Sequence, residues 1–105
     1  MSNLRIIFIT CGSEDESLNL AKSLVAEKLA ACVNIIPKIR SIYTWQEQLC
    51  DQNEQLLIVK TSTDKLSACQ KRVLELHSYS TPEFVGIAPT EVLERYSEWW
   101  TAALK

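Results

Sequence analysis

His77 is the only histidine in the sequence, and histidine is the side chain whose ordinary pKa lies near neutrality. Tyr79 and Glu83 follow it closely, so an imidazole, a phenol and a carboxylate belong to one loop. Such a set could exchange protons with a substrate or bind a cation. A histidine at the end of a helix also interacts favourably with the helix dipole, so a structural capping role is the alternative.

Cys11 ends an apolar segment just before an expected helix N-terminus. Amide donors and the helix dipole lower the pKa of a thiol at such a position, which makes it a better ligand or nucleophile. A small apolar residue at a strand end is the alternative. In the fold predicted below, the first strand neighbours the fourth, which brings Cys11 near Glu83 or His77. Because these donors suit copper or zinc, we predict metal ligands at Cys11, His77 and Glu83.

Four other side chains stand out for their positions. Lys60 closes the apolar run 56–59, where its ammonium either extends to the surface or pairs with an anion. Tyr43 and Trp45 are large aromatic groups on an element expected to project, which favours contact with a neighbouring molecule. Cys32 begins a strand and is expected to be packed.

Hydrophobic periodicity and turn signals predict the elements that position these residues. Ser13 and Glu16 form a capping box, in which each side chain bonds to the other's backbone amide. Pro37 cannot donate to a strand ladder and predicts a bulge or bend. The expected elements are a strand over 3–10, a helix over 13–30, strands over 32–45 and 49–61 with a turn between them, a helix from 62 to about 77, a strand over 83–88 and a last helix from 89.

This order, β-α-β-β-α-β plus a terminal helix, predicts an α+β, ferredoxin-like split βαβ fold with one four-stranded antiparallel sheet. Both crossover helices lie on one face of such a sheet, so the other face is bare. Residues 6–9 are apolar on both sides of the first strand. Because an apolar face is unfavourable in water, we expect self-association.

Composition limits the classes of function. The 105 residues fit one domain, 1–105, and are 47% hydrophobic and 23% charged. A net charge of -2 makes nucleic acid an unlikely partner, and the apolar runs are too short to span a membrane. The N-terminus lacks a secretory signal pattern and the four cysteines have no C-x-x-C pairing, so we expect a cytoplasmic protein with reduced thiols.

Four segments are distinctive in combination: E-K-L-A-A-C-V-N at 27–34, S-I-Y-T-W at 41–45, L-L-I-V-K-T at 56–61 and L-H-S-Y-S-T-P-E at 76–83. Together they resemble the divalent-cation tolerance (CutA) family. The resemblance implies a homotrimer built like PII signalling proteins, with long hairpins reaching neighbouring subunits and a link to copper and other divalent metals. It also implies an inter-subunit cleft that includes Cys32, Trp45, Lys60 and Tyr79.

The resemblance extends to the predicted site. Cys11 matches a strand-end cysteine of some members, and the residues of the family's H-P-Y-x-x-P-E signature are His77, Tyr79, Pro82 and Glu83. Two positions depart from the pattern. Ser78 stands where proline is usual and loosens the loop that holds His77, while Glu47 stands where a glycine usually makes the hairpin turn.

Three functional hypotheses follow. The first is a binding protein for copper(II) or another divalent cation that acts in metal tolerance. The second is a PII-like sensor or scaffold that binds an anionic small molecule in the inter-subunit cleft near Lys60 and His77. The third, an enzyme with His77 as acid or base beside Tyr79 or Glu83, has no supporting motif, so we expect no enzymatic activity.

Overall fold

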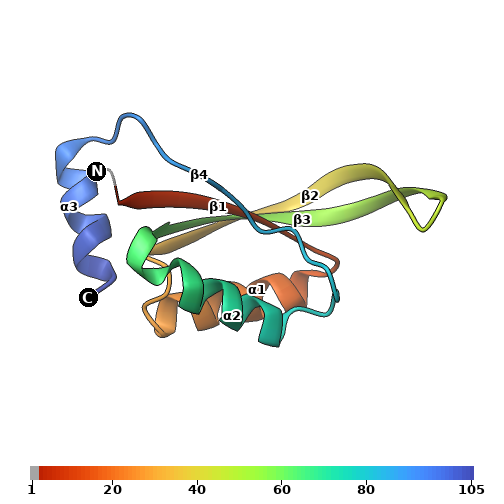
Figure 1. Ribbon diagram of the computed structural model, residues 1–105, viewed down its shortest axis with the longest axis horizontal. Helices are drawn as coiled ribbons and strands as arrows, with labels where there is room; N and C mark the ends of the chain where they lie inside the picture. Colours follow the sequence, from red (N-terminus) through yellow and green to blue (C-terminus); the bar gives the residue numbers. More distant parts are fainter. Residues whose placement is uncertain (1–2) are drawn as a thin grey trace.

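The computed structural model describes residues 3–105 and contains one antiparallel sheet with strand order β2-β3-β1-β4. This topology confirms the predicted ferredoxin-like split βαβ arrangement (Figure 1). The elements are β1 (Leu4–Cys11), α1 (Glu14–Ala26), β2 (Cys32–Trp45), β3 (Gln48–Ser62), a 3-10 turn (Thr63–Lys65), α2 (Leu66–Leu76), β4 (Val85–Ile87) and α3 (Glu94–Ala103).

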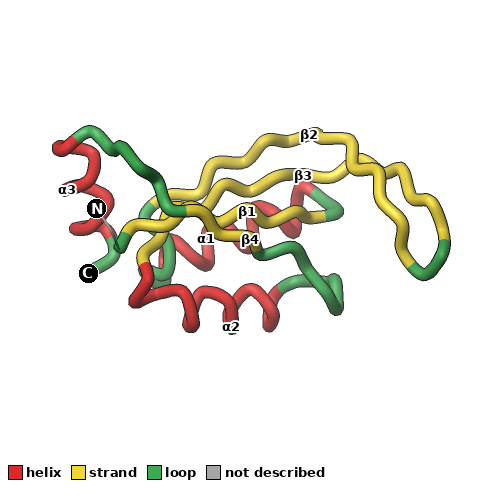
Figure 2. The backbone as a smooth tube through the Cα atoms, turned by 45° about the horizontal axis from the view of Figure 1, so that its top comes forward, coloured by secondary structure: helices red, strands yellow, loops and turns green. Residues whose placement is uncertain are grey.

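The main core lies between the sheet and the two crossover helices. Figures 1 and 2 show α1 and α2 side by side on one side of the sheet. Alternate side chains of β1 point toward these helices, as the period of two in a strand requires. The fully buried members of this core include Ile7, Ile9, Cys11, Leu20, Leu24, Leu57, Val59, Cys69 and Val73.

The hairpin of β2 and β3 extends well beyond the rest of the sheet, so the molecule measures 44 Å in its longest direction and 25 Å in the next (Figure 1). The register of β2 on β3 shifts between Ile36 and Ile39, which confirms the irregularity predicted at Pro37. At the tip, Gln46 and Glu47 have φ values of 51° and 65°. A two-residue hairpin turn needs positive φ, and the departure from glycine at Glu47 therefore leaves a strained turn.

The face of the sheet opposite α1 and α2 carries a row of apolar side chains, which we call the open face. Register places these side chains together, because residues opposite one another in a ladder share a face. Val85 and Ile87, on the edge strand, are 52% and 47% exposed. The open face consists of Ile6, Phe8, Ile36, Leu56, Ile58, Val85 and Ile87.

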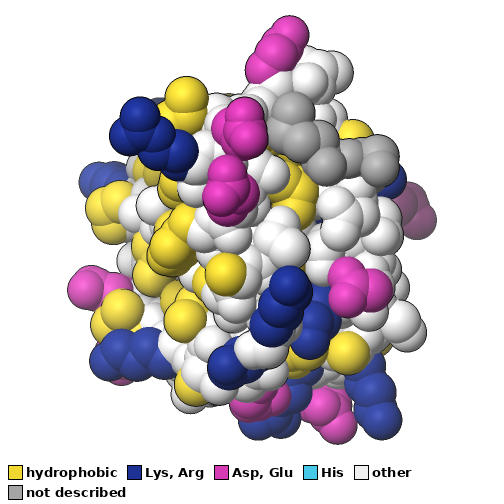
Figure 3. All heavy atoms as spheres, turned by 90° about the vertical axis from the view of Figure 1, so that its left-hand side faces the viewer, with side chains coloured by type: hydrophobic (Ala, Val, Ile, Leu, Met, Phe, Trp, Pro, Cys, Tyr) yellow, Lys and Arg dark blue, Asp and Glu magenta, His cyan; other side chains and the backbone are white. Residues whose placement is uncertain are grey.

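Helix α3 packs at one end of the sheet and forms a second, smaller core with Leu4, Ala31 and Leu104. The adjacent tryptophans of α3 have different environments. Trp100 is 2% exposed and donates its indole N–H to the Thr61 carbonyl at 2.9 Å, whereas Trp99 is 48% exposed. Figure 3, which looks onto the end of the molecule where α3 lies, shows hydrophobic side chains gathered on one side and charged groups around them.

Some element boundaries differ from the prediction. The first helix ends at Ala26, because Lys28 adopts a φ of 60° and the Leu29 amide bonds back to the Leu24 carbonyl, as in a Schellman motif. The last helix begins at Glu94 and not at Pro89; Val92, expected on that helix, reaches the second core from a non-helical segment. The fourth strand is shorter than expected, with only three residues.

Within residues 3–105, none of the helices has the length and apolar character needed to cross a membrane.

The two tryptophans of α3 allow a matched test of this packing. We expect Trp100→Phe to lower the free energy of unfolding by about 2–3 kcal/mol, because it leaves a void and removes the donor to a buried carbonyl. Trp99→Phe keeps a ring beside Tyr96 and should change it by less than about 0.5 kcal/mol. Urea denaturation at one protein concentration measures both; equal losses would contradict the described environments.

Candidate metal-binding site

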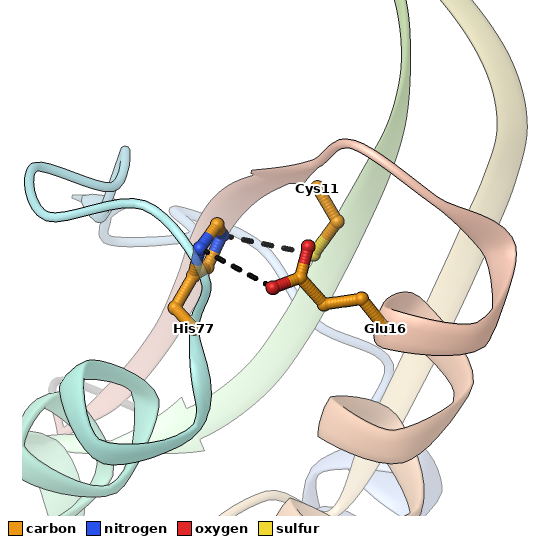
Figure 4. A group of neighbouring side chains, drawn as sticks. All are labelled: Cys11, Glu16 and His77. Atoms are coloured by element: carbon orange, nitrogen blue, oxygen red, sulfur yellow. Dashed lines mark hydrogen bonds and ion pairs between the residues drawn. The ribbon is translucent and has the colours of Figure 1, made fainter.

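Three segments that are distant in the sequence bring a thiol, a carboxylate and an imidazole together. Cys11 ends β1, Glu16 lies in the first turn of α1, and His77 follows α2 as its C-cap. Figure 4 shows the three side chains pointing toward one another. Their potential ligand atoms all lie within 4.8 Å of one another. The structure thus places two of the three predicted ligands, Cys11 and His77, in one group, which we call the ligand group.

His77 is held by hydrogen bonds on both ring nitrogens. Nε2 lies 2.7 Å from the Thr10 carbonyl oxygen, and the Tyr79 amide donates to Nδ1 at 3.0 Å. A carbonyl can only accept and an amide N–H can only donate, so Nε2 carries the proton and Nδ1 a lone pair. The imidazole is also buried, with a side-chain exposure of 0%. The backbone amide of His77 donates to the Val73 carbonyl, which continues the hydrogen bonding of α2 to this residue.

Glu16 is the member of the ligand group that sequence reasoning missed. Its backbone amide donates to Ser13 Oγ at 3.2 Å, as the capping box predicts. The other half of the prediction is wrong, because the Glu16 carboxylate accepts from the Ser78 amide at 2.6 Å and so ties α1 to the loop after α2. Burial alone would raise the pKa of Glu16, but its hydrogen bonds with Ser78, together with nearby His77 and the Gly12 backbone, outweigh that effect and the pKa is lowered.

Cys11 corrects the expectation of an activated thiol. Its side chain is fully buried, and this desolvation raises the pKa of the thiol to about 11. A hydrogen bond with Ser17 acts in the opposite direction but is the smaller effect. Sγ lies 3.8 Å from His77 Nε2. The position before the helix therefore does not lower the pKa of Cys11, because the sheet and helices exclude water from it.

Glu83 lies outside the ligand group, in a neighbouring pocket of about 650 Å³. The pocket lies where the β2–β3 hairpin meets the loop after His77. It contains a second carboxylate, Glu54, which is 7% exposed and accepts a hydrogen bond from the Tyr79 hydroxyl at 2.8 Å. Desolvation and the nearby charge of Glu54 raise the pKa of Glu83. Glu54 was not singled out from the sequence, although an acid beside the apolar run of β3 is a usable signal.

The four predicted cleft residues fall into two pairs within the subunit. Trp45 and Tyr79 line the pocket. Cys32 and Lys60 are opposite each other in the β2–β3 ladder, on the open face. Lys60 Nζ lies 3.0 Å from both Asn34 Oδ1 and the Tyr96 hydroxyl.

This placement also separates Lys60 from His77. Lys60 is paired with Ile6 of β1, whereas His77 contacts Cys11 on the opposite, helix-covered face. Among the residues that line the pocket, the only charged side chains are the two carboxylates. Within one subunit, Lys60 and His77 therefore lie on opposite faces of the sheet, and the anion site in the inter-subunit cleft stays a prediction.

The ligand group fits a divalent cation in its donor types and spacing. Thiolate and imidazole are preferred ligands of copper and zinc, and a carboxylate adds a third protein donor. Two changes must accompany binding: Cys11 must lose its proton, and His77 must give up one of its two hydrogen bonds. The group is therefore closed by hydrogen bonds, and a cation would have to replace part of that network.

Comparison with known proteins shows what the chain as a whole is similar to. The model of the family described as CutA1 divalent ion tolerance protein matches residues 5–103. The divalent-cation tolerance protein CutA of Thermus thermophilus is 43% identical over 94 residues, which cover 90% of this chain and 91% of the relative.

Solved structures give the same result. The divalent cation tolerance protein Cut A1 from Thermus thermophilus superimposes with a TM-score of 0.90 at 41% identity, covering 92% of this chain and 94% of the other. A CutA from Archaeoglobus fulgidus, described as a periplasmic divalent cation tolerance protein, has a TM-score of 0.93 at 33% identity, covering 97% and 99%. The matched residues include the whole ligand group and nearly all of the sheet. The chain therefore belongs to the CutA1 divalent ion tolerance family.

Proposed function

We propose that this chain binds a divalent cation, copper in the first place, through the ligand group and acts in metal tolerance as a binding protein. The observation that carries the proposal is the convergence of Cys11, Glu16 and His77, whose ligand atoms lie within 4.8 Å of one another. No pair of these residues is adjacent in the sequence, so the fold itself assembles the group. The family's description, divalent ion tolerance, supports the same function.

The donor types of the ligand group favour a soft cation over a hard one. Ca²⁺ and Mg²⁺ prefer oxygen ligands and keep water, and the group offers only one carboxylate. Copper and zinc accept sulfur and nitrogen donors. Because burial raises the pKa of Cys11 to about 11, a bound cation has to displace the thiol proton, and binding should weaken as the pH falls.

A binding role is also more consistent with the state of His77 than a catalytic one. An acid or base must reach the proton that it transfers. Both nitrogens of His77 are already hydrogen-bonded to the protein, and the ring is buried beneath the loop. We therefore propose that the protein is not an enzyme.

We also propose that the protein assembles as a homotrimer with the open face inside the assembly. The open face includes half-exposed Val85 and Ile87, and apolar side chains also protrude from the projecting hairpin. Leu49 and Ile42 of that hairpin are 77% and 64% exposed. An apolar surface of this kind marks an interface, and a projecting hairpin can reach a neighbouring subunit.

We propose that the protein is located in the cytoplasm. All four cysteines are free thiols, two of them buried, which fits a reducing compartment. The periplasmic description of the Archaeoglobus fulgidus protein belongs to that relative.

Calorimetric titration of the reduced protein with Cu(II), under anaerobic conditions in a weakly coordinating buffer, tests the metal site. We expect one site per chain, and a loss of affinity of more than about tenfold in Cys11→Ser, Glu16→Gln and His77→Ala, since even residues that only hydrogen-bond to a metal's ligands contribute that much. Co(II) serves as a second probe, because a thiolate ligand produces a charge-transfer absorption band that Cys11→Ser should abolish.

Two matched variants control for nonspecific binding. Cys69 is also fully buried and its thiol pKa is also raised to about 11 by desolvation, but it lies outside the ligand group. Cys69→Ser and Glu83→Gln should leave the affinity unchanged. Substoichiometric heat in the wild type, or an equal loss in Cys69→Ser, would contradict the proposed site.

Sedimentation equilibrium tests the assembly. We expect the mass of three chains for the wild type, and dissociation in Ile87→Lys, because a charge on the open face cannot be buried without a large penalty. Leu74→Lys is the control: Leu74 is 53% exposed, but on α2 and away from the open face. A stable wild-type monomer, or equal dissociation in Leu74→Lys, would refute the proposed interface.

A further inference from the structure

Gln55 carries an unsatisfied polar atom in the interior. Its side-chain oxygen, Oε1, is the one buried side-chain nitrogen or oxygen atom within residues 3–105 that has no hydrogen-bond partner. The residue is 8% exposed, so water has little access to it. Leaving a buried acceptor unpaired is unfavourable, and most such groups in folded proteins have a partner or a functional reason.

The sheet register places Gln55 beside the ligand group. Gln55 is the direct partner of Cys11 in the β1–β3 ladder, at the last paired position of β1. Side chains that are directly opposite in an antiparallel pair lie on the same face, with Cβ atoms about 4.5–5.5 Å apart. The side chains of Gln55 and Cys11 therefore leave the ladder side by side on the helix-covered face. The preceding residue, Glu54, points to the other face, where Tyr79 binds its carboxylate.

Donor number and charge both favour a neutral oxygen at this position. The ligand group supplies three donors, whereas structural zinc sites and related soft-metal sites usually have four. With a divalent cation bound, the thiolate of Cys11 and the carboxylate of Glu16 balance its two charges, and His77 adds none. A fourth donor that was charged would leave a net charge in a buried site, which is costly. An amide oxygen completes the set and keeps the site neutral.

We propose that Gln55 is the fourth protein donor, through its side-chain oxygen, to the cation held by Cys11, Glu16 and His77. This inference rests on the proposed function, because it adds a ligand to the same site. The oxygen has no hydrogen-bond partner within residues 3–105, so no protein contact has to break for it to bind a cation. The cation that this oxygen would bind then explains why the oxygen has no partner within the protein.

The alternative is a structural role, in which the Gln55 amide helps to hold the end of the β1–β3 ladder. The two roles predict opposite effects on the metal-free protein. If the oxygen serves only the cation, an apolar replacement of similar size removes an unpaired buried acceptor and leaves the fold at least as stable. If the oxygen supports the fold, the same replacement destabilises it.

The experiment combines Gln55→Leu with the matched control Gln52→Leu, an exposed glutamine three residues earlier on β3. Thermal unfolding is measured on the metal-free proteins, and Co(II) affinity by titration of the reduced proteins. We expect Gln55→Leu to unfold at the wild-type temperature or above it and to bind Co(II) at least about tenfold more weakly, with an altered visible spectrum because the donor set changes. Gln52→Leu should bind Co(II) as the wild type does.

The outcomes separate this inference from the function on which it rests. If Cys11→Ser and His77→Ala abolish a stoichiometric site but Gln55→Leu binds like the wild type, Gln55 is not a ligand and the proposed function survives. A lower unfolding temperature of metal-free Gln55→Leu would assign the amide a structural role and overturn the inference. If the wild type has no stoichiometric site, both proposals fail.

Discussion

The hydrogen bond between His77 Nε2 and the Thr10 carbonyl joins the end of α2 to the end of β1, with a distance of 2.7 Å between the two atoms. It determines where the ligand group forms. The Thr10 carbonyl, which lies beyond the part of β1 that pairs with β4, orients the ring so that it lies beside Cys11 and near Glu16. The Tyr79 amide fixes the other nitrogen, and the Ser78 amide fixes Glu16. Three consecutive residues after α2 thus set the positions of two ligands, and the helices then exclude water from the thiol. A loop that moved away would remove His77 from Cys11 and would release the Glu16 carboxylate from the Ser78 amide.

The same arrangement explains why the site is closed in the metal-free protein. Each donor already has an internal partner or a proton, so a cation gains its ligands only by displacing them. The proposed site would discriminate between cations by the bonds that each forms: a soft metal would replace the S–H and N–H interactions with strong bonds, whereas a hydrated hard cation would not. The open face is independent of this chemistry. It lies on the other side of the sheet, so the proposed assembly and the proposed metal binding would use opposite faces of the same strands.

Much of the fold follows from local patterns in the sequence. The strand at Cys32–Trp45, the irregularity after Ile36 and the order of the sheet were predictable from alternation, from Pro37 and from the β-α-β-β-α-β order. The ligand group was predictable only in part. Cys11 and His77 stood out as the strand-end thiol and the single histidine, but Glu16 looked like a capping residue, because its partner Ser78 is 62 positions away. Gln55 carried no signal, since only the register that pairs it with Cys11 gives it a role. The pKa of Cys11 was predicted in the wrong direction, because the helix N-terminus was visible in the sequence and the burial was not.

The protonation state of the imidazole most directly tests whether the ring is held between β1 and the loop, and a single histidine makes its assignment unambiguous. Nitrogen and carbon NMR of the metal-free, reduced protein labelled at histidine distinguishes the two neutral tautomers. We predict one tautomer with the proton on Nε2, where the Thr10 carbonyl accepts it, and a lone pair on Nδ1 facing the Tyr79 amide. A proton on Nδ1, or a mixture of tautomers in rapid exchange as in a solvent-exposed imidazole, would show that the ring is not held in this way and would contradict the proposed construction of the site.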